Sequence, residues 1–431
     1  MLSLDKRGMF IGMEIQRVLM KEVGEIGPLV LKKQCASIGR TPATLELEDL
    51  PRLSKLVVKA VQETIGYERA NKIEKEIQKF KFLADLERLS GEKGDHATRG
   101  EVNALVSLGN ICRTIGEWEE AIGYYRKAMA RSKEIGYELK ESEALRNIGH
   151  IYKRRNNWDE AVRYFKISLD ISHKLGDNQG MSDAHRGMGY VNWRRGEYAK
   201  ATEHYKRAME LAMKLGDKAT IGTTHIEFGL VYSDTGRLEN AEEEYRSAIS
   251  VLSDAREVHQ TARAYNNLGD IYLQRGEYEK AIECFESCKE ESSKINHQMM
   301  MGWGWFNSGE AFIKAGDAEK GIDHCMKGLE IVSKMEDRIG IYAAERNLGQ
   351  GYGMLKKWDE SEEHYNRAKA IVEELSSPFN MAHLQYEWGR TEKLRGRKKE
   401  AKKHLEEAAS VFKSLGADVY LGRVKKELED L

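Results

Sequence analysis

Cysteine and histidine are the side chains of this chain whose types could bind a metal ion or act as nucleophiles. Cys284 and Cys288 are four residues apart and would share one helix face, but a zinc site needs a second pair of ligands, which the sequence does not place nearby. Cys35, Cys112 and Cys325 are scattered, so five cysteines in 431 residues form no disulfide framework. We therefore expect reduced, packed thiols and no metal.

Four histidines recur at one spacing, and this spacing argues against catalysis. They are His204, His324, His364 and His404. Equivalent positions in neighbouring helical units lie about 10 Å apart, too far to share one ion. The sequence also lacks a G-x-S-x-G, P-loop or H-E-x-x-H pattern. We expect no catalytic residue, no cofactor and no enzymatic activity.

Recognition of another chain is the chemistry that the remaining polar side chains could perform. Arginine and lysine pair with carboxylates, and an asparagine amide can bond both the donor and the acceptor of a peptide backbone. The candidates are Arg113, Arg146, Asn147, His150, Lys153, Arg154, Arg186, Arg194, Asn267, Asn307, Arg346 and Asn347. Trp303, Phe306 and Tyr386 are aromatic candidates.

These candidates are placed by a repeat of forty residues. Its markers are Gly109, Gly149, Gly189, Gly229, Gly269, Gly309, Gly349 and Gly389, with no insertion or deletion between them. A bulky apolar residue usually precedes each glycine, and an aromatic usually follows three residues later. A glycine interior to a helix costs about 1 kcal/mol relative to alanine. We therefore expect each repeat glycine to permit close approach of two helices.

Each repeat has the pattern of a helical hairpin. In the first repeat, a second glycine, Gly116, ends the first helix, and Trp118, Ala121 and Tyr125 follow at the spacing of a second helix. We expect the small residue at the Ala121 position to face the repeat glycine, so that the two backbones touch. The aromatics would then fill the space between hairpins.

The motif N-L-G-D-I-Y-x6-Y-E-K-A-I-x2-F, at residues 267–285, resembles the tetratricopeptide repeat family. That family's common unit has about 34 residues, whereas forty-residue units resemble those of the spindle adaptor Pins and of kinesin light chains, which hold partner peptides. The resemblance implies an all-α fold, a right-handed α-solenoid of antiparallel hairpins. Eight hairpins would span residues 98–416, followed by a capping helix at 417–431.

The same resemblance implies a concave groove lined by the first helices. At 100° per residue, positions −6, −3, −2, +1, +4 and +5 from the repeat glycine share one arc, which contains all the candidates. The first three repeats would be positive there, and Asn147, Asn267, Asn307 and Asn347 would form an asparagine ladder. In repeat six, Trp303 and Phe306 could instead replace lost core aromatics, so both an apolar anchor pocket and a core role remain open.

Residues 1–95 lack the repeat and form a separate helical module for docking, capping or dimerisation. Periodicity predicts helices at 9–21, 28–37, 50–65 and 67–89, and a polar linker at 91–96. A helix-turn-helix with its second helix near residues 44–49 is an alternative, but that segment is acidic and would face phosphates. Nucleic acid is therefore an unlikely partner by sequence.

Composition agrees with a contact-making scaffold. The formal net charge is −1, charged residues make up 32%, and no run of apolar residues is long enough to span a membrane. We expect a cytoplasmic, non-enzymatic adaptor that binds a protein or peptide with acidic residues, with possible homo-oligomerisation through residues 1–95. The alternative is a ligand- or peptide-sensing regulator whose N-terminal module contacts DNA or an effector.

Overall fold

The computed structural model describes residues 4–90 and 95–431, and every regular element in these ranges is a helix. The chain forms two compact units, Met1–Glu227 (unit 1) and Phe228–Leu431 (unit 2), which are described separately. Most of the predicted linker, residues 91–94, lies outside the described ranges, and its last two residues begin a helix. No helix in the described residues is both long and apolar enough to cross a membrane.

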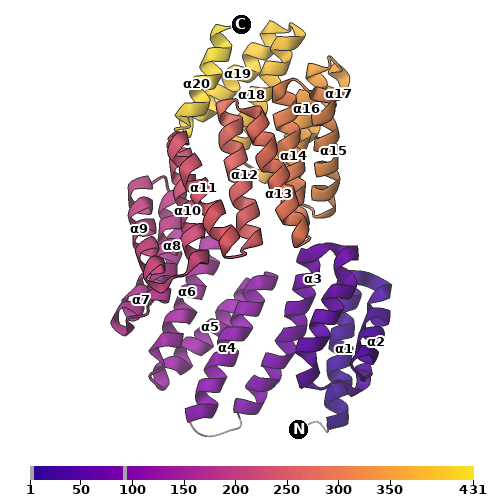
Figure 1. Ribbon diagram of the computed structural model, residues 1–431, viewed down its shortest axis with the longest axis vertical. Coiled ribbons are helices and arrows are strands. Elements are labelled where there is room, and N and C mark those ends of the chain that lie inside the picture. Colours follow the sequence, from indigo (N-terminus) through magenta and orange to yellow (C-terminus); the bar gives the residue numbers. More distant parts are fainter. Residues whose placement is uncertain (1–3, 91–94) are drawn as a thin grey trace. The chain divides into compact units, whose positions relative to one another are not determined.

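Three helices form the N-terminal region of unit 1 (Figure 1). They are α1 (Leu4–Val23), α2 (Gly27–Ser37) and α3 (Leu50–Ser90). Buried aliphatic residues such as Ile15, Leu31, Leu53 and Ile73 give them a hydrophobic core of their own. One long helix, α3, replaces the two helices predicted for residues 50–65 and 67–89. It also packs against the first repeat helix.

The segment considered as a second helix of a helix-turn-helix forms two short 3-10 turns, η2 (Pro42–Thr44) and η3 (Leu47–Asp49). The hydroxyl of Thr44 accepts from the main-chain N–H of Thr41 at 2.9 Å, and the Asp49 carboxylate accepts from that of Glu46 at 2.9 Å. Short polar side chains that bond the nearby backbone favour turns over helices. The helix expected in that alternative is therefore absent from residues 42–49.

The rest of the chain forms consecutive helix pairs, which confirms the predicted all-α solenoid of hairpins. The first helices are α4 (Asp95–Ile115), α6 (Glu138–Arg154), α8 (Asn178–Arg194), α10 (Lys218–Asp234), α12 (Val258–Arg275), α14 (Gln298–Ala315), α16 (Arg338–Met354) and α18 (Pro378–Arg395). The second helices are α5 (Trp118–Glu134), α7 (Trp158–Leu175), α9 (Tyr198–Leu215), α11 (Leu238–Asp254), α13 (Tyr278–Lys294), α15 (Ala318–Lys334), α17 (Trp358–Leu375) and α19 (Lys398–Ser414). A last helix, α20 (Asp418–Glu429), follows.

The repeat glycine makes room for the aromatic ring of its own hairpin. A Cβ atom at Gly109 would lie 2.5 Å from the Tyr125 ring, and one at Gly229 would lie 2.5 Å from the Tyr245 ring. The ring, and not the small residue at the Ala121 position, therefore fills the space beside the glycine. Gly309 differs, because Cys325 replaces the aromatic and a Cβ there would meet the Cys325 Sγ at 2.4 Å and the Gly321 carbonyl oxygen at 2.8 Å.

The turn between the two helices of a hairpin needs a left-handed backbone. Gly116 has φ +87° and Gly276 has φ +77°, as expected for a glycine after a helix end. In the two repeats that lack this glycine, Asn156 and Lys356 take the same conformation, with φ +57° and +58°. The chain therefore keeps the turn geometry even where the residue type is unfavourable.

Contacts between hairpins show which face is the inner one. First helices pack against the second helix of the preceding hairpin, as α6 on α5, α8 on α7 and α14 on α13 show. First helices also contact one another: α4 with α6 and α6 with α8 in unit 1, and α12, α14, α16 and α18 in succession in unit 2. Elements on the inside of a curved stack approach most closely. The first helices therefore line the inner face of each unit.

The last helix of unit 2 returns toward the start of that unit. A Cβ atom at Gly236, in the turn between α10 and α11, would lie 3.7 Å from Cγ2 of Val419 in α20 (Figure 1). On the same helix, Tyr420 packs on Phe379 and Phe412. The last helix of unit 2 therefore approaches the turn between α10 and α11 at Val419.

Candidate functional site

On the inner face of unit 1, one carboxylate joins two candidate residues. Asp183 of α8 accepts from Arg146 Nε at 2.9 Å and lies 3.1 Å from His150 Nε2, both on α6. Although burial opposes ionisation, the His150 ring and the Arg146 guanidinium hold the pKa of Asp183 well below its usual range. Burial lowers the pKa of His150. The cluster therefore links two hairpins.

Arg186 forms a second link on this face. Its Nε and Nη2 atoms donate to the two carboxylate oxygens of Glu227 at 3.0 and 2.9 Å. Such two-point pairs are strong and fixed in geometry. The positive charge predicted for Arg186 is therefore neutralised within the protein, and this side chain is not free for a partner's carboxylate.

Lys153, Arg113 and Arg146 have N–H groups on this face that are not all used in hydrogen bonds with the described residues. Lys153 forms no ion pair with any described residue and lies over the Tyr190 ring, 4.7 Å from its centroid. Burial lowers the pKa of Lys153 to about 8. Arg113 Nε and Arg146 Nη1 are buried and have no hydrogen-bond partner. Unit 1 therefore presents N–H donors without acceptors.

The other unit 1 candidates are placed differently. Asn147 is partly buried on α6 and belongs to the same predicted arc of that helix as Arg146 and Lys153. Arg154 and Arg194 are exposed at helix ends, and the Arg194 guanidinium lies 5.7 Å from the Trp193 ring centroid. These two cations could meet a ligand only at the edge of the inner face.

The inner face of unit 2 contains a buried network of charges. Glu310 of α14 accepts from Lys314 Nζ at 2.6 Å and from Arg346 Nη2 of α16 at 2.8 Å. Although burial opposes ionisation, Lys314 and Arg346 hold the pKa of Glu310 well below its usual range. Each charge is balanced within the protein, as buried charges require.

Arg346 uses its remaining donors inside the protein. Nε and Nη2 donate to the Asn347 side-chain oxygen at 3.2 and 2.8 Å, and Nη1 donates to His383 Nδ1 at 3.0 Å. The Asn347 amide in turn donates to the main-chain oxygen of Phe306 at 3.1 Å. Arg346 and Asn347, both predicted as groove residues, are therefore buried structural groups.

A further carboxylate extends this network toward the C-terminus. Glu387 of α18 accepts from Arg390 Nη1 at 3.1 Å, and Arg390 Nε donates to Glu427 of α20 at 3.1 Å. Tyr386 is partly buried beside them, and the Arg390 guanidinium lies 5.6 Å from its ring centroid. These contacts fasten α20 to the inner face of unit 2.

One helix of unit 2 keeps polar groups without partners. On α12, the Asn267 amide nitrogen and the Gln260 side-chain oxygen are buried and unbonded. Asp270, three residues after Asn267, forms no hydrogen bond or ion pair with the described residues. Burial, followed by the Glu310 charge, raises the pKa of Asp270 to about 7. Asn307 differs, because its amide donates to Asn266 at 2.9 Å.

The repeat-six aromatics belong to the protein interior. Phe306 is 5% exposed and packs with Cys325 and Leu348, and Trp303 contacts the same cluster. The Trp303 indole Nε1 donates to Asp337 Oδ2 at 2.7 Å. Of the two open interpretations, Phe306 fits the core role, and it does not project into the predicted groove.

The recurring histidines bond within their own hairpins. His324 lies 2.8 Å from the Ser308 hydroxyl, His364 lies 2.6 Å from a Glu345 oxygen, and His204 lies 3.0 Å from His185. His404 pairs with Gln385. These contacts join the two helices of a hairpin, in agreement with the scaffold role expected from the spacing.

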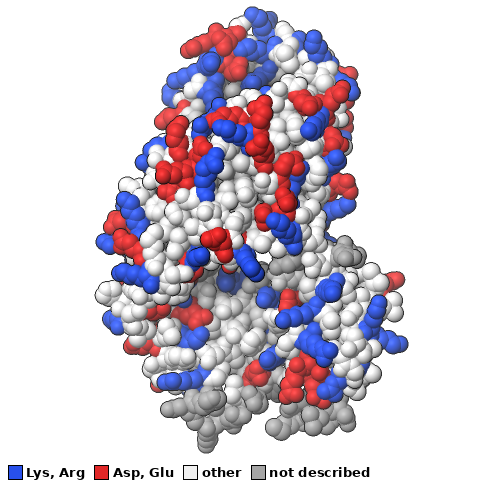
Figure 2. Space-filling view, viewed as in Figure 1, with Lys and Arg blue, Asp and Glu red and all other residues white. Residues whose placement is uncertain are grey.

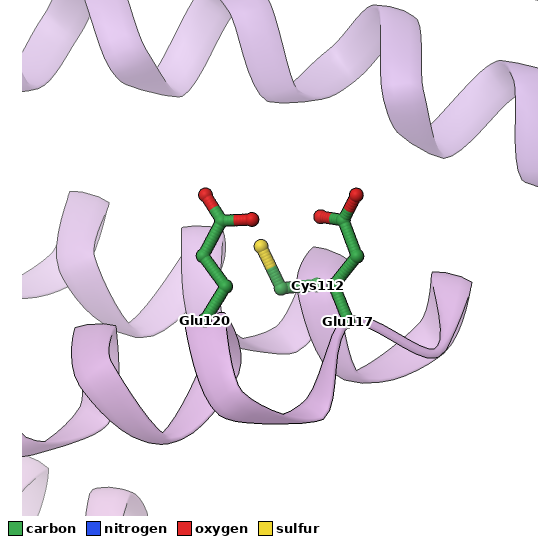
Figure 3. Close-up of side chains that lie close together, drawn as sticks. All are labelled: Cys112, Glu117 and Glu120. Carbon is green, nitrogen blue, oxygen red and sulfur yellow. The ribbon is translucent and has the colours of Figure 1, made fainter.

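One group of potential metal ligands lies near the N-terminal region. The ligand atoms of Cys112, Glu117 and Glu120 are within 4.8 Å of one another, and the three side chains point to the same side (Figure 3). Lys79 Nζ of α3 lies 2.7 Å from Glu117 and 3.0 Å from Glu120. Burial also raises the pKa of Cys112 to about 12, against the thiolate form that binds metals. The ammonium group fills the cation position and joins α3 to the first hairpin.

Several residues of these networks were not selected from the sequence. Asp270, Glu310 and Arg390 stand at position +1, and Glu387 stands at −2, both within the predicted arc. Counting the acidic residues of that arc together with the basic ones would have found them. The candidate list kept mainly arginine and asparagine, and therefore overstated the free positive charge.

Sequence comparison decides the family. The sequence profile of the tetratricopeptide repeat family matches residues 100–174, 140–214, 180–254, 220–290 and 340–414. The chain is a tetratricopeptide repeat protein. No curated protein matches its sequence.

Solved structures share the fold of this tetratricopeptide repeat protein at low identity. The apo form of the quorum sensor NprR from B. thuringiensis is 12% identical, with a TM-score of 0.57, covering 85% of this chain and 98% of that one. A STAND protein with a tetratricopeptide repeat sensor from Pyrococcus horikoshii is 15% identical, with a TM-score of 0.55 and coverage of 87% and 64%. A Rap protein complexed with Competence and Sporulation Factor is 16% identical, with a TM-score of 0.50 and coverage of 85% and 99%.

Proposed function

We propose that this tetratricopeptide repeat protein is a cytoplasmic, non-enzymatic scaffold that binds a segment of a partner protein along the inner face of its first helices. On unit 1 the segment presents acidic residues to Arg113, Arg146 and Lys153. The observation that carries the proposal is that two buried donors on this face, Arg113 Nε and Arg146 Nη1, have no acceptor among the described residues, and that the Lys153 ammonium lies near them over the Tyr190 ring.

The energetic argument concerns unmet hydrogen bonds. A buried donor without an acceptor costs about 1–3 kcal/mol, and a ligand that supplies the acceptor recovers that cost. Carboxylates and main-chain carbonyls are such acceptors, and an extended segment offers both. Arg186 and Arg346 contribute nothing of this kind, since their donors are bonded to Glu227 and Glu310.

The charged surface visible in Figure 2 gives less reason for specific recognition. Figure 2 shows acidic and basic side chains interspersed over the visible face of unit 2, without a large patch of one sign. Interspersed charge of this kind is typical of a solvated surface. The inner face, where buried polar groups lack partners, is the better candidate for a binding site.

A sensing regulator is the second candidate function. The repeats and the last helix make up about three quarters of the chain, so a match covering 85% of it extends into the N-terminal helices. NprR is a quorum sensor, and a Rap protein of the same fold was crystallised with Competence and Sporulation Factor. In such a protein, ligand binding to the repeats would change what α1 to α3 contact.

Selection from a random peptide library displayed on phage tests the scaffold function without a known partner. Wild type should select peptides enriched in aspartate and glutamate. Lys153→Gln and Arg113→Gln should each weaken synthetic copies of those peptides by about tenfold, since a bond to a charged group contributes about 1.5–3 kcal/mol. Lys166→Gln, an exposed lysine on α7, is the matched control and should change nothing. Failure to select any peptide would refute the proposal.

A further inference from the structure

The inner side of α12 carries a stripe of polar groups with unused bonding capacity. Gln260, Asn267 and Asp270 are separated by seven and three residues, which places them on one helix face. The Gln260 oxygen and the Asn267 amide nitrogen are buried without partners, and Asp270 has neither a hydrogen bond nor an ion pair among the described residues. Buried polar groups are normally bonded, so such a stripe needs an explanation.

The neighbouring cations do not neutralise Asp270. Lys314 and Arg346 are close enough to affect its charge, but both are bonded to Glu310. Arg263, one turn before Asn267 on the same helix, forms no ion pair with the described residues and is not among the charges that shift the pKa of Asp270. Among the described residues, the Asp270 carboxylate thus remains an open acceptor on this helix face, together with the Gln260 oxygen.

We propose that Asp270, with the amide of Asn267 beside it, binds a cationic group of the partner segment, an ammonium or a guanidinium. The proposal deepens the scaffold function and rests on it. The Asn267 amide donates to a main-chain carbonyl oxygen of the segment, and the Gln260 oxygen accepts from a main-chain N–H one to two turns away. Asp270 then pairs with the positive charge of a residue adjacent to that carbonyl.

Charge and hydrogen bonding select a cation over an anion here. Asp270 and Glu310 are two carboxylates on facing helices, and each raises the cost of bringing another negative group close. A carboxylate offers only acceptors, so its complement is an N–H donor. A cationic donor also supplies a positive charge, and an ionised carboxylate that is shielded from water needs such a charge to offset its lost hydration.

Peptides selected by wild type on phage are the probes for this site. We expect them to contain a lysine or arginine at a fixed position. Replacing that residue with norleucine should weaken binding to wild type by about tenfold or more, whereas the same replacement should change binding to Asp270→Asn by less than twofold. Acetylation of the peptide amino terminus distinguishes a side-chain cation from a terminal amine.

Two controls separate this inference from the scaffold function. Glu279→Gln removes one exposed charge from α13 of the same hairpin and should behave as wild type. Asp270→Asn should remain folded by its melting curve, because the side chains have nearly the same shape. If wild type selects peptides but the basic residue matters equally to wild type and Asp270→Asn, or no basic position emerges, the cation site is refuted while the scaffold function stands.

Discussion

The Arg346 guanidinium and the Glu310 carboxylate form an ion pair across two consecutive first helices, with 2.8 Å between Nη2 and Oε2. Both side chains are buried, so water does not hydrate either charge and each depends on the other for neutralisation. Their positions in the repeat differ, −3 for Arg346 and +1 for Glu310, because the pair crosses from one hairpin to the next. The repeats of unit 2 are therefore joined by specific polar bonds as well as by apolar packing.

Removing one member of this pair should destabilise unit 2 strongly. Glu310→Gln removes the carboxylate that Arg346 and Lys314 share and leaves Lys314 only the longer contact with Glu387 at 3.9 Å. An uncompensated buried charge costs about 3–5 kcal/mol. Urea unfolding followed by circular dichroism measures the loss. The double variant Glu310→Gln/Arg346→Met should lose less than the sum of the two single variants. Additive losses would show that the two side chains are not coupled.

The repeat glycines should differ from other helical glycines in their response to alanine. A Cβ at Gly309 would lie 2.4 Å from Cys325 Sγ and 2.8 Å from a carbonyl oxygen, so Gly309→Ala should lower stability by about 1–3 kcal/mol. Gly123, in α5, has no atom within 4 Å of such a Cβ. Gly123→Ala should therefore stabilise the protein by up to about 1 kcal/mol. Thermal melting of both variants checks the contrast, and equal effects would contradict it.

Phe306 should behave as a core residue. Truncation of a buried phenylalanine to alanine costs about 3–5 kcal/mol, so Phe306→Ala should lower the melting temperature markedly. The control is Met326→Ala, because this methionine of α15 is 47% exposed and its truncation should cost less than about 0.5 kcal/mol. A Phe306→Ala variant that melts like wild type but loses peptide binding would instead support the anchor pocket.

Asp270 should give unit 2 a pH-dependent stability near neutrality. Its pKa is raised to about 7 in the folded protein, above the value of about 3.9 for an unfolded chain. The folded state therefore holds the proton more tightly, and this stabilisation, complete below pH 4, is lost as pH rises to about 7. Asp270→Asn cannot ionise. The melting temperature of the variant relative to wild type should therefore increase from pH 4 to pH 8.

The environment of Asp270 contains few other groups that titrate in this window. The groups that face it are Glu310, Lys314, Arg346, Cys288, Tyr245 and Tyr420. Burial raises the pKa of Tyr420 further above neutrality, although Arg423 opposes it, and burial raises the pKa of Cys288 to about 12. A melting difference that is constant from pH 4 to pH 8 would contradict the assignment to Asp270.

The fold could be predicted from the sequence because one spacing governs it. Gly109 and its equivalents fix both helices of each hairpin, and the observed boundaries follow that register. The N-terminal region has no repeat, so the prediction there was weaker. The continuous helix α3 was predicted as two helices, because periodicity alone does not show whether a chain bends near residue 66.

The candidate site was harder to predict, because function depends on pairing between repeats. The register placed Arg146, Arg186 and Arg346 on the correct arc, yet their carboxylate partners lie 36 to 41 residues away along the chain. A pattern of residue types shows which side chains share a face and does not show which are bonded to each other. Asp270 has no such partner among the described residues, and only the contacts in the structure reveal this.

The meeting of Val419 with the turn at Gly236 has a consequence for how unit 2 unfolds. In an open repeat array each unit senses only its immediate neighbours, so the ends fray independently. In unit 2 the last helix also contacts the turn between α10 and α11, so loosening α20 exposes that turn to water. When the chain is shortened at residue 417, which removes α20, amide hydrogen exchange in the turn between α10 and α11 should therefore rise, although about 180 residues separate that turn from α20 in sequence.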